Sequence, residues 1–232
     1  MSNHFNININ NNPSFTGHCY TGGICETNGY AIETSEGWIL IDAPEGFLSF
    51  IKSYNIDVKL LMLTHQHFDH VMDAASISAH FECPIWAHSP YDKKLTLESL
   101  FDLGSGPKMS VDPYNISKIL TETGDKEEET SLINGFNFKV FHVPGHSPDS
   151  ICFYLSDSDI IFGGDVLFNG SIGRTDFPDG DTNQLIEGIK NKIFPLNDDI
   201  IIFPGHGGET TIGEEKINNP FLISYHMDYG PK

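Results

Sequence analysis

The residues best suited to chemistry stand together in the segment Thr64–His70, which reads Thr-His-Gln-His-Phe-Asp-His. It places His65, His67, His70 and the carboxylate of Asp69 within six consecutive positions. Imidazole and carboxylate groups together bind zinc, iron or manganese, the ions that proteins use to activate water. The alternative is a solvated, histidine-rich turn. Because clustered imidazoles are costly to bury unless each ring nitrogen has a partner, the segment predicts a metal site.

Three later segments share one design, in which an apolar strand ends beside glycine and a potential ligand. They are Phe141–Pro148 with His146, Ile160–Val166 with Asp165, and Ile201–Gly207 with His206. Glycine permits the tight turn that brings the backbone close to an ion. A single histidine or aspartate at a strand end is usually a turn residue. Four strand ends with the same chemistry, however, favour one shared metal centre.

The elements around these segments predict how the ligands are positioned. Val58–Thr64 is a nearly continuous apolar run, as in a strand buried on both faces, and the histidine cluster follows it at the carboxyl end. Further strands are expected over Asn28–Thr34, Trp38–Asp42, Pro84–Ala87, Phe136–Val143, Ser150–Leu155, Asp159–Phe162 and Asp199–Phe203, and helices over Leu48–Tyr54, Val71–Phe81, Tyr91–Leu103 and Thr182–Ile193. Asp181 is the expected N-cap of the last helix. This order predicts two packed sheets with outer helical layers.

The length of 232 residues, with 39% apolar and 12% aromatic content, favours one folded domain over residues 1–232. Residues 1–13 are expected to form a polar, Asn-rich tail or an edge strand. A net charge of −19, from 32 acidic and 13 basic residues, disfavours nucleic acid and anionic membranes as partners. The composition leaves the oligomeric state open.

The absence of a leader sequence and the cysteine pattern predict a cytoplasmic protein. No basic segment followed by an apolar run opens the chain, and no apolar stretch reaches 18 residues. The four cysteines form no C-x-x-C pair, so free thiols in a reducing compartment are expected at Cys19, Cys25, Cys83 and Cys152.

The candidate ligands resemble, in order and spacing, the ligand pattern of the metallo-β-lactamase superfamily of hydrolases. The resemblance implies an α+β fold, a four-layer αββα sandwich with the metal site at one edge of the two sheets. It also implies two divalent ions, zinc first, with iron and manganese as alternatives. By this resemblance one ion takes His65, His67 and His146, the other takes Asp69, His70 and His206, and Asp165 bridges them.

Two longer stretches resemble the small bacterial branch of glyoxalase II-like hydrolases: Gly164–Pro178, and Gly205–Glu215 followed by Asn219-Pro220-Phe221. The resemblance covers about residues 30–221. It implies hydrolysis of a small-molecule thioester of the S-lactoylglutathione type, with a glutathione conjugate as the first candidate. A hydroxide bridging the two ions would attack the carbonyl, with Asp69 orienting it and a metal taking up the oxyanion charge. Thiolate leaves without a strong general acid.

Residues near the proposed ligands have several expected roles. Arg174, the only arginine, follows Asp165 in the same loop. Two roles stay open for it: an ion pair with Asp176 or Asp179, or contact with an anionic substrate. Asp42 stands where the superfamily carries a buried aspartate and is expected to support the ligands. Other histidines outside the ligand set, such as His142, are expected to have packing or supporting roles.

Two other activities remain open. Gly173–Phe177 also resembles persulfide dioxygenases, in which two histidines and one aspartate hold a single iron; here these would be His65 or His67, His146 and Asp165. A lactonase or another ester hydrolase would use the same two metals. The basic and tyrosine-bearing helical extension of full-length glyoxalase II is not matched, since 26 residues follow His206, with Lys216 and Lys232 as the basic ones.

Overall fold

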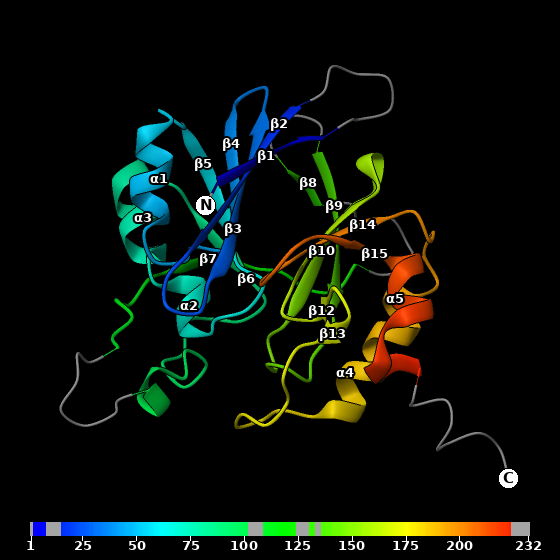
Figure 1. The fold of residues 1–232 in the computed structure, drawn as a ribbon. Helices are drawn as coiled ribbons and strands as arrows, with labels where there is room; N and C mark the ends of the chain where they lie inside the picture. The colour runs from blue at the N-terminus through cyan, green and yellow to red at the C-terminus, as the bar shows by residue number, and fades with distance from the viewer. Residues whose placement is uncertain (1, 8–14, 102–108, 124–129, 133–135, 224–232) are drawn as a thin grey trace, which may run out of the picture.

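The computed structural model describes residues 2–7, 15–101, 109–123, 130–132 and 136–223. Two large β-sheets face each other, and helices lie on both outer sides (Figure 1). The first sheet has the order β1 (Ser2–Ile7), β2 (Phe15–Gly22), β3 (Thr27–Thr34), β4 (Gly37–Ile41), β5 (Val58–Met62), β6 (Ile85–Ala87) and β7 (Ile116–Ile119). Its pairs are antiparallel from β1 to β4 and parallel from β4 to β7. Ser2–Ile7 is thus an edge strand.

The second sheet has the order β15 (Thr210–Thr211), β14 (Ile201–Pro204), β11 (Ile160–Gly164), β10 (Ile151–Leu155), β9 (Phe136–His142) and β8 (Thr130–Leu132). Its pairs are antiparallel except for β11 with β14, which run parallel. A separate two-stranded hairpin consists of β12 (Leu167–Phe168) and β13 (Ser171–Ile172). The parallel pair brings the carboxyl ends of β11 and β14 side by side.

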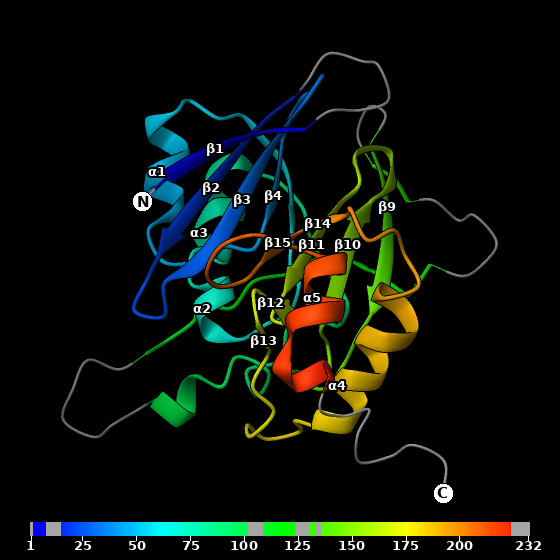
Figure 2. The same cartoon turned by 45° about the vertical axis from the view of Figure 1, so that its right-hand side comes forward.

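The outer layers are helical. On the first sheet lie α1 (Phe47–Ser53), α2 (Phe68–Val71) and α3 (Ala74–Phe81), and on the second lie α4 (Thr182–Gly188), its π-helical continuation η3 (Ile189–Ile193) and α5 (Ile212–Asn218). Figure 2 shows α4 and α5 on the same outer face. The αββα sandwich is therefore confirmed. The side chain of Asp181 accepts a hydrogen bond from the backbone N–H of Gln184 at 3.0 Å, as expected for the N-cap of α4.

Strands buried on both faces explain the continuous apolar runs of the sequence. Along β5, Leu60 enters the layer between the sheets, whereas the next residue, Leu61, packs under the helices. The layer between the sheets also holds Phe138, Phe153 and Phe162, which are fully buried. Burying each such side chain contributes about 1.5–3 kcal/mol, so this layer fixes the sheets relative to each other.

The helix expected over Val71–Phe81 is divided and begins earlier. The chain forms α2 from Phe68 and then α3 from Ala74, so Asp69 and His70 lie in a short helix. The division has a local cause, because the carbonyl of His70 accepts from the N–H of Ala43 at 2.7 Å, and the N–H of Asp73 donates to the carbonyl of Ala43 at 2.9 Å. These backbone groups are bound to the β4–α1 connection and do not continue the helix.

The prediction of a helix over Tyr91–Leu103 is wrong for residues 91–101, the part of this segment that the structure describes. Only the 3₁₀ turn η1 (Glu98–Phe101) is helical there. Leu97 has a positive φ of 55°, which interrupts an α-helix. The buried carboxylate of Glu98 accepts from the N–H of Val111 at 2.7 Å and pairs with Lys93 at 2.5 Å, which fixes the turn.

Other features agree with the sequence analysis. The four cysteines are free thiols, as predicted. Among the described residues, no helix has the length and apolar character that a membrane span requires.

Candidate metal centre

The site lies at the edge where the carboxyl ends of strands from both sheets meet. His65 and His67 follow β5, His146 follows β9, Asp165 follows β11 and His206 follows β14. Backbone hydrogen bonds join the sheets here: the N–H of Asn28 donates to the carbonyl of Gly205 at 2.8 Å, and the N–H of Ile151 donates to the carbonyl of Thr64 at 2.8 Å. Asp69 and His70 enter from α2.

The structure brings all seven predicted ligands together. One potential ligand atom each of His65, His67 and His146 lie within 4.8 Å of one another. The same holds for Asp69, His70 and His206. These two groups match the sets that the sequence resemblance implies. A third group, His65, His70 and Asp165, meets the same distance limit and contains members of both sets.

Asp165 lies between the two sets. Its Oδ2 is 3.3 Å from Nε2 of His146 in the first set and 3.3 Å from Nε2 of His206 in the second. Its Oδ1 is 3.3 Å from Nε2 of His70. One carboxylate therefore contacts both sets, as a bridging ligand must.

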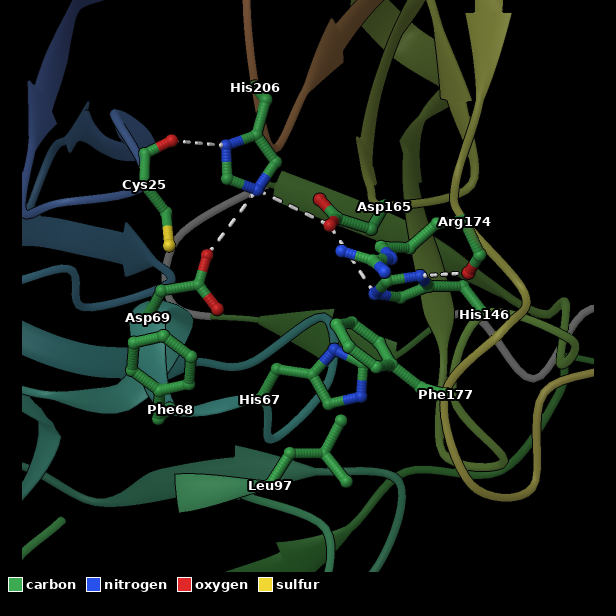
Figure 3. Close-up of a pocket in the computed structure, with 10 residues that line it drawn as sticks. All are labelled: Cys25, His67, Phe68, Asp69, Leu97, His146, Asp165, Arg174, Phe177 and His206. Atoms are coloured by element: carbon green, nitrogen blue, oxygen red, sulfur yellow. Dashed lines mark hydrogen bonds and ion pairs between the residues drawn. The ribbon is translucent and has the colours of Figure 1, made fainter. Parts of the chain in front are cut away.

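Hydrogen bonds at Nδ1 orient the imidazoles. Nδ1 of His146 donates to the carbonyl of Arg174 at 2.7 Å, and Nδ1 of His206 donates to the carbonyl of Cys25 at 3.1 Å. Because a carbonyl oxygen only accepts, Nδ1 carries the proton in both rings, and a neutral ring then keeps its Nε2 lone pair for an ion. Figure 3 shows both rings turned toward the centre of the site.

Asp42 orients two further predicted ligands, His65 and His70. Its carboxylate accepts from the N–H and the hydroxyl of Thr64, both at 2.8 Å, and from Nδ1 of His70 at 2.8 Å. Since the Thr64 hydroxyl gives its proton to Asp42, its oxygen accepts from Nδ1 of His65 at 3.1 Å. This network agrees with the supporting role expected for Asp42.

Several buried polar atoms of the site have no hydrogen-bond partner, as expected where a divalent ion binds. Among the described residues, Nε2 of His65, His70 and His146 and Oδ1 of Asp165 are buried without a hydrogen-bond partner. Buried polar atoms are normally paired, because an unpaired one costs about 1–3 kcal/mol. Four such atoms from three segments of the chain, gathered at one edge of the two sheets, indicate a cation site.

The electrostatics of the site also favour a cation. Burial, with His146 as the next cause, lowers the pKa of His67 to about 3, so this imidazole is neutral. Burial alone would raise the pKa of Asp69, but His70 and other neighbours outweigh it and hold that pKa at about 2. Burial alone would lower the pKa of His206, but the carboxylates of Asp165 and Asp69 raise it to about 10. This edge of the site stabilises positive charge.

Apolar side chains line the pocket beside the predicted ligands. Phe68, Leu97 and Phe177 line it together with Cys25 (Figure 3). The ring of Phe177 stands edge-on to His67, with 5.7 Å between the centroids. Sequence reasoning did not find these residues, nor Thr27, whose hydroxyl donates to Oδ2 of Asp69 at 2.7 Å. They carry no ligand-type pattern, and tertiary contacts alone bring them to the site.

The structure also shows where Arg174 and His142, the residues expected near the predicted ligands, lie. Nε and Nη2 of Arg174 each bind Asp176 at 2.7 Å, and its guanidinium lies 4.1 Å from the ring centroid of Phe177. Of the two partners predicted for the ion pair, the structure selects Asp176, while Arg174 still lines the pocket. His142 lies outside the ligand sets and stacks on His88, with ring centroids 3.9 Å apart.

Comparison with known proteins agrees with this geometry. Residues 22–206 match the family model of the metallo-beta-lactamase superfamily. The chain is 44% identical over 181 residues to the hydroxyacylglutathione hydrolase GloC of Haemophilus influenzae, covering 78% of this chain and 83% of the relative.

Two solved structures match most of the chain. The BLEG-1 B3 metallo-beta-lactamase superposes with a TM-score of 0.76 at 33% identity, over 89% of this chain and 99% of that one. TTHA1623 in a di-iron-bound form superposes with a TM-score of 0.72 at 34% identity, over 88% and 99%. On its sequence match and its fold, the chain belongs to the metallo-beta-lactamase superfamily.

Proposed function

We propose that this protein is a dinuclear metal-dependent hydrolase that cleaves thioesters of the S-lactoylglutathione type. The observation that carries the proposal is the pair of three-residue ligand sets with Asp165 between them. The similarity to the hydroxyacylglutathione hydrolase GloC supports the substrate class. The similarity to TTHA1623, which binds two irons, supports two ions.

The ligands divide between two ion positions, for which zinc is the first candidate. His65, His67 and His146 would hold one ion, Asp69, His70 and His206 would hold the other, and Asp165 would contribute to both. When bound, two such ions lower the pKa of a water between them and neutralise the charge that develops on an attacked carbonyl. The protein's own part is to fix the ligand lone pairs through the Nδ1 hydrogen bonds.

The side chains around the ligands suit a thioester. Asp69 is held through Oδ2 by Thr27, so its other oxygen is left to orient the attacking water. The apolar wall of Phe68, Leu97 and Phe177 excludes water from the acyl group. Cys25 is unsuited as a nucleophile, because burial and then the carboxylate of Asp69 raise its pKa to about 11.

Arg174 is our candidate for recognition of an anionic group on the substrate. Among the residues that line the described pocket it is the one arginine, and no lysine lines it. Its Nε and Nη2 bind Asp176, which leaves the donors of Nη1 for a substrate carboxylate. Lys216 is committed elsewhere, to Asp198 and to the carbonyl of Leu196, and Lys232 lies outside the described residues.

The test is to count metal ions per chain and to assay S-lactoylglutathione hydrolysis by the wild type and by His206→Ala. We expect two ions in the wild type and one in the variant, with kcat/KM lowered by about 100-fold or more. The matched control is His80→Ala, since His80 is exposed on α3, and it is expected to keep both ions and full activity.

Parallel assays separate the other functions. Oxygen consumption with glutathione persulfide tests the dioxygenase, and homoserine lactone and a cephalosporin test lactonase and β-lactamase activity. A single bound iron with oxygen uptake and no thioester hydrolysis would overturn the proposal. Turnover of a lactone or a cephalosporin in place of thioesters would retain the metal centre but refute the substrate class.

A further inference from the structure

The hairpin β12–β13 touches predicted ligands of both sets. It follows Asp165 directly, and the ring of Phe168 lies edge-on to His206, with 6.0 Å between the centroids. Just after β13, the carbonyl of Arg174 accepts the Nδ1 proton of His146 at 2.7 Å. The position of this hairpin therefore sets how two ligand imidazoles are aimed.

Gly173, which directly follows β13, packs closely against the predicted ligands Asp165 and His146. A Cβ atom at Gly173 would overlap the carbonyl oxygen of Asp165 and would lie 3.0 Å from Cβ of His146. The N–H of Gly173 also donates to the carbonyl of Val166. A displaced hairpin would accordingly move both Asp165 and His146.

A buried carboxylate on α5 holds the hairpin in place. Glu215 is 1% exposed, and its two oxygens accept from the N–H of Gly170, at the tip of the hairpin, at 3.0 and 3.2 Å. The hydroxyl of Thr210 donates to Oε1 at 2.6 Å, and Nδ2 of Asn219 donates to Oε2 at 2.7 Å. The same Nδ2 donates to the carbonyl of Ser171 in β13 at 3.0 Å.

These contacts require a carboxylate at position 215. Each oxygen accepts from two donors, and among the described residues no cation pairs with Glu215, so hydrogen bonds alone compensate its burial. Burying a carboxylate costs free energy, and anchoring a surface helix does not require one. A need to hold the tip of the hairpin with a strong hydrogen-bond acceptor explains why a carboxylate lies here.

We propose that Glu215, assisted by Asn219, is a positioning residue that locks the β12–β13 hairpin and thereby fixes His146 and His206 around the metal ions. The inference rests on the proposed metal centre. It also gives a role to Thr210, Glu215 and Asn219, which lie in the stretches Gly205–Glu215 and Asn219-Pro220-Phe221 that the sequence analysis singled out and which are not predicted ligands. Glu215 holds Gly170, and the backbone from Gly170 to Arg174 connects this contact to the carbonyl that binds His146.

The test compares Glu215→Gln with the neighbouring Glu214→Gln. Glutamine keeps the size of the side chain but replaces one acceptor oxygen with a donor that faces another donor. Glu214 is exposed, binds Asn218 on its own helix and does not contact the hairpin, so it is a matched control. Both variants are titrated with Zn²⁺ and Co²⁺ in competition with a chromophoric chelator.

We expect Glu215→Gln to weaken metal binding by about 10–100-fold, in the range typical of residues that orient metal ligands. The visible spectrum of the Co²⁺ form and the NMR resonance of the His146 Nδ1 proton should also change. Glu214→Gln should leave all three measurements unchanged. If Glu215→Gln does not fold, Asn219→Ala removes the donor to Ser171 and is expected to give the same weakening.

A lower melting temperature with wild-type metal affinity and an unchanged Co²⁺ spectrum would overturn the inference, because Glu215 would then only anchor α5. This failure is distinct from failure of the proposed function. If the wild type itself bound neither Zn²⁺ nor Co²⁺, the metal centre would be refuted. If it bound two ions and Glu215→Gln bound them equally well, the positioning role alone would be refuted.

Discussion

At the scale of single residues, the predicted ligands are oriented by groups that lie outside the ligand sets. Asp42 is 1% exposed, and it binds His70 directly and His65 through Thr64. The carbonyls of Arg174 and Cys25 do the same for His146 and His206. Each bond fixes a tautomer, so an ion bound at this site would meet lone pairs that are already oriented.

Replacing Asp42 with Asn tests this orienting network. The carboxylate accepts three hydrogen bonds, and an amide NH₂ in its place would face a donor, which costs about 1–3 kcal/mol. We expect Asp42→Asn to fold with lower stability and to bind Zn²⁺ about 10–100-fold more weakly, measured by chelator competition. Asp57→Asn at an exposed ion pair is the control. Wild-type affinity in Asp42→Asn would contradict the prediction.

At the scale of elements, the site is built from strand ends that approach unusually closely. A Cβ atom at Gly205 would overlap the carboxylate of Asp165 and would lie 2.7 Å from Cε1 of His70. The N–H of Gly205 donates to the carbonyl of Gly164 at 2.8 Å, which ties the ends of β14 and β11 together. The parallel pairing of these strands thus places Asp165 beside His206.

Gly205→Ala should separate these strand ends. Because overpacking costs about 1–3 kcal/mol, we expect a lower free energy of unfolding in urea, together with loss of metal after dialysis. Gly208→Ala introduces the same methyl group two residues past His206, where a Cβ would meet nothing within 4 Å. The prediction fails if the two variants retain metal equally well.

At the scale of the whole molecule, the predicted ligands come from two halves that are joined by apolar packing and by hydrogen bonds such as those of Asn28 with Gly205 and Ile151 with Thr64. His65, His67 and His70 belong to the half with the first sheet, and His146, Asp165 and His206 to the half with the second. An ion bound between them is a cross-link that exists only in the folded state. Metal binding should therefore stabilise the fold as a whole.

Removal of metal with a chelator should lower the melting temperature, and Zn²⁺ should restore it. Free Zn²⁺ at 100 times its dissociation constant adds about 2.7 kcal/mol to the free energy of unfolding. Scanning calorimetry of the metal-free and reloaded protein measures the shift, with Mg²⁺ as the control because it prefers oxygen ligands. Equal melting temperatures for the metal-free and Zn²⁺-loaded forms would show that no ion links the halves.

The sequence by itself determined the sandwich and the candidate ligands, because both leave local patterns. Strands such as Val58–Met62 are apolar except for Lys59 since both faces are buried, and glycine marks the turns that carry His146, Asp165 and His206. The family resemblance then paired the ligands into two sets, and the geometry is consistent with that pairing.

Tertiary structure alone decided the remaining features. The tie between His206 and Cys25 spans 181 positions, so no local pattern could reveal it. The failure of the helix after Tyr91 depends on Glu98 bonding to Val111, and the choice of Asp176 over Asp179 depends on loop geometry. The physical reason is the same in all three cases. Hydrogen-bond partners and apolar pocket linings depend on which distant segments meet in space. Ligand-type residues and buried strands, by contrast, can be recognised from local sequence patterns.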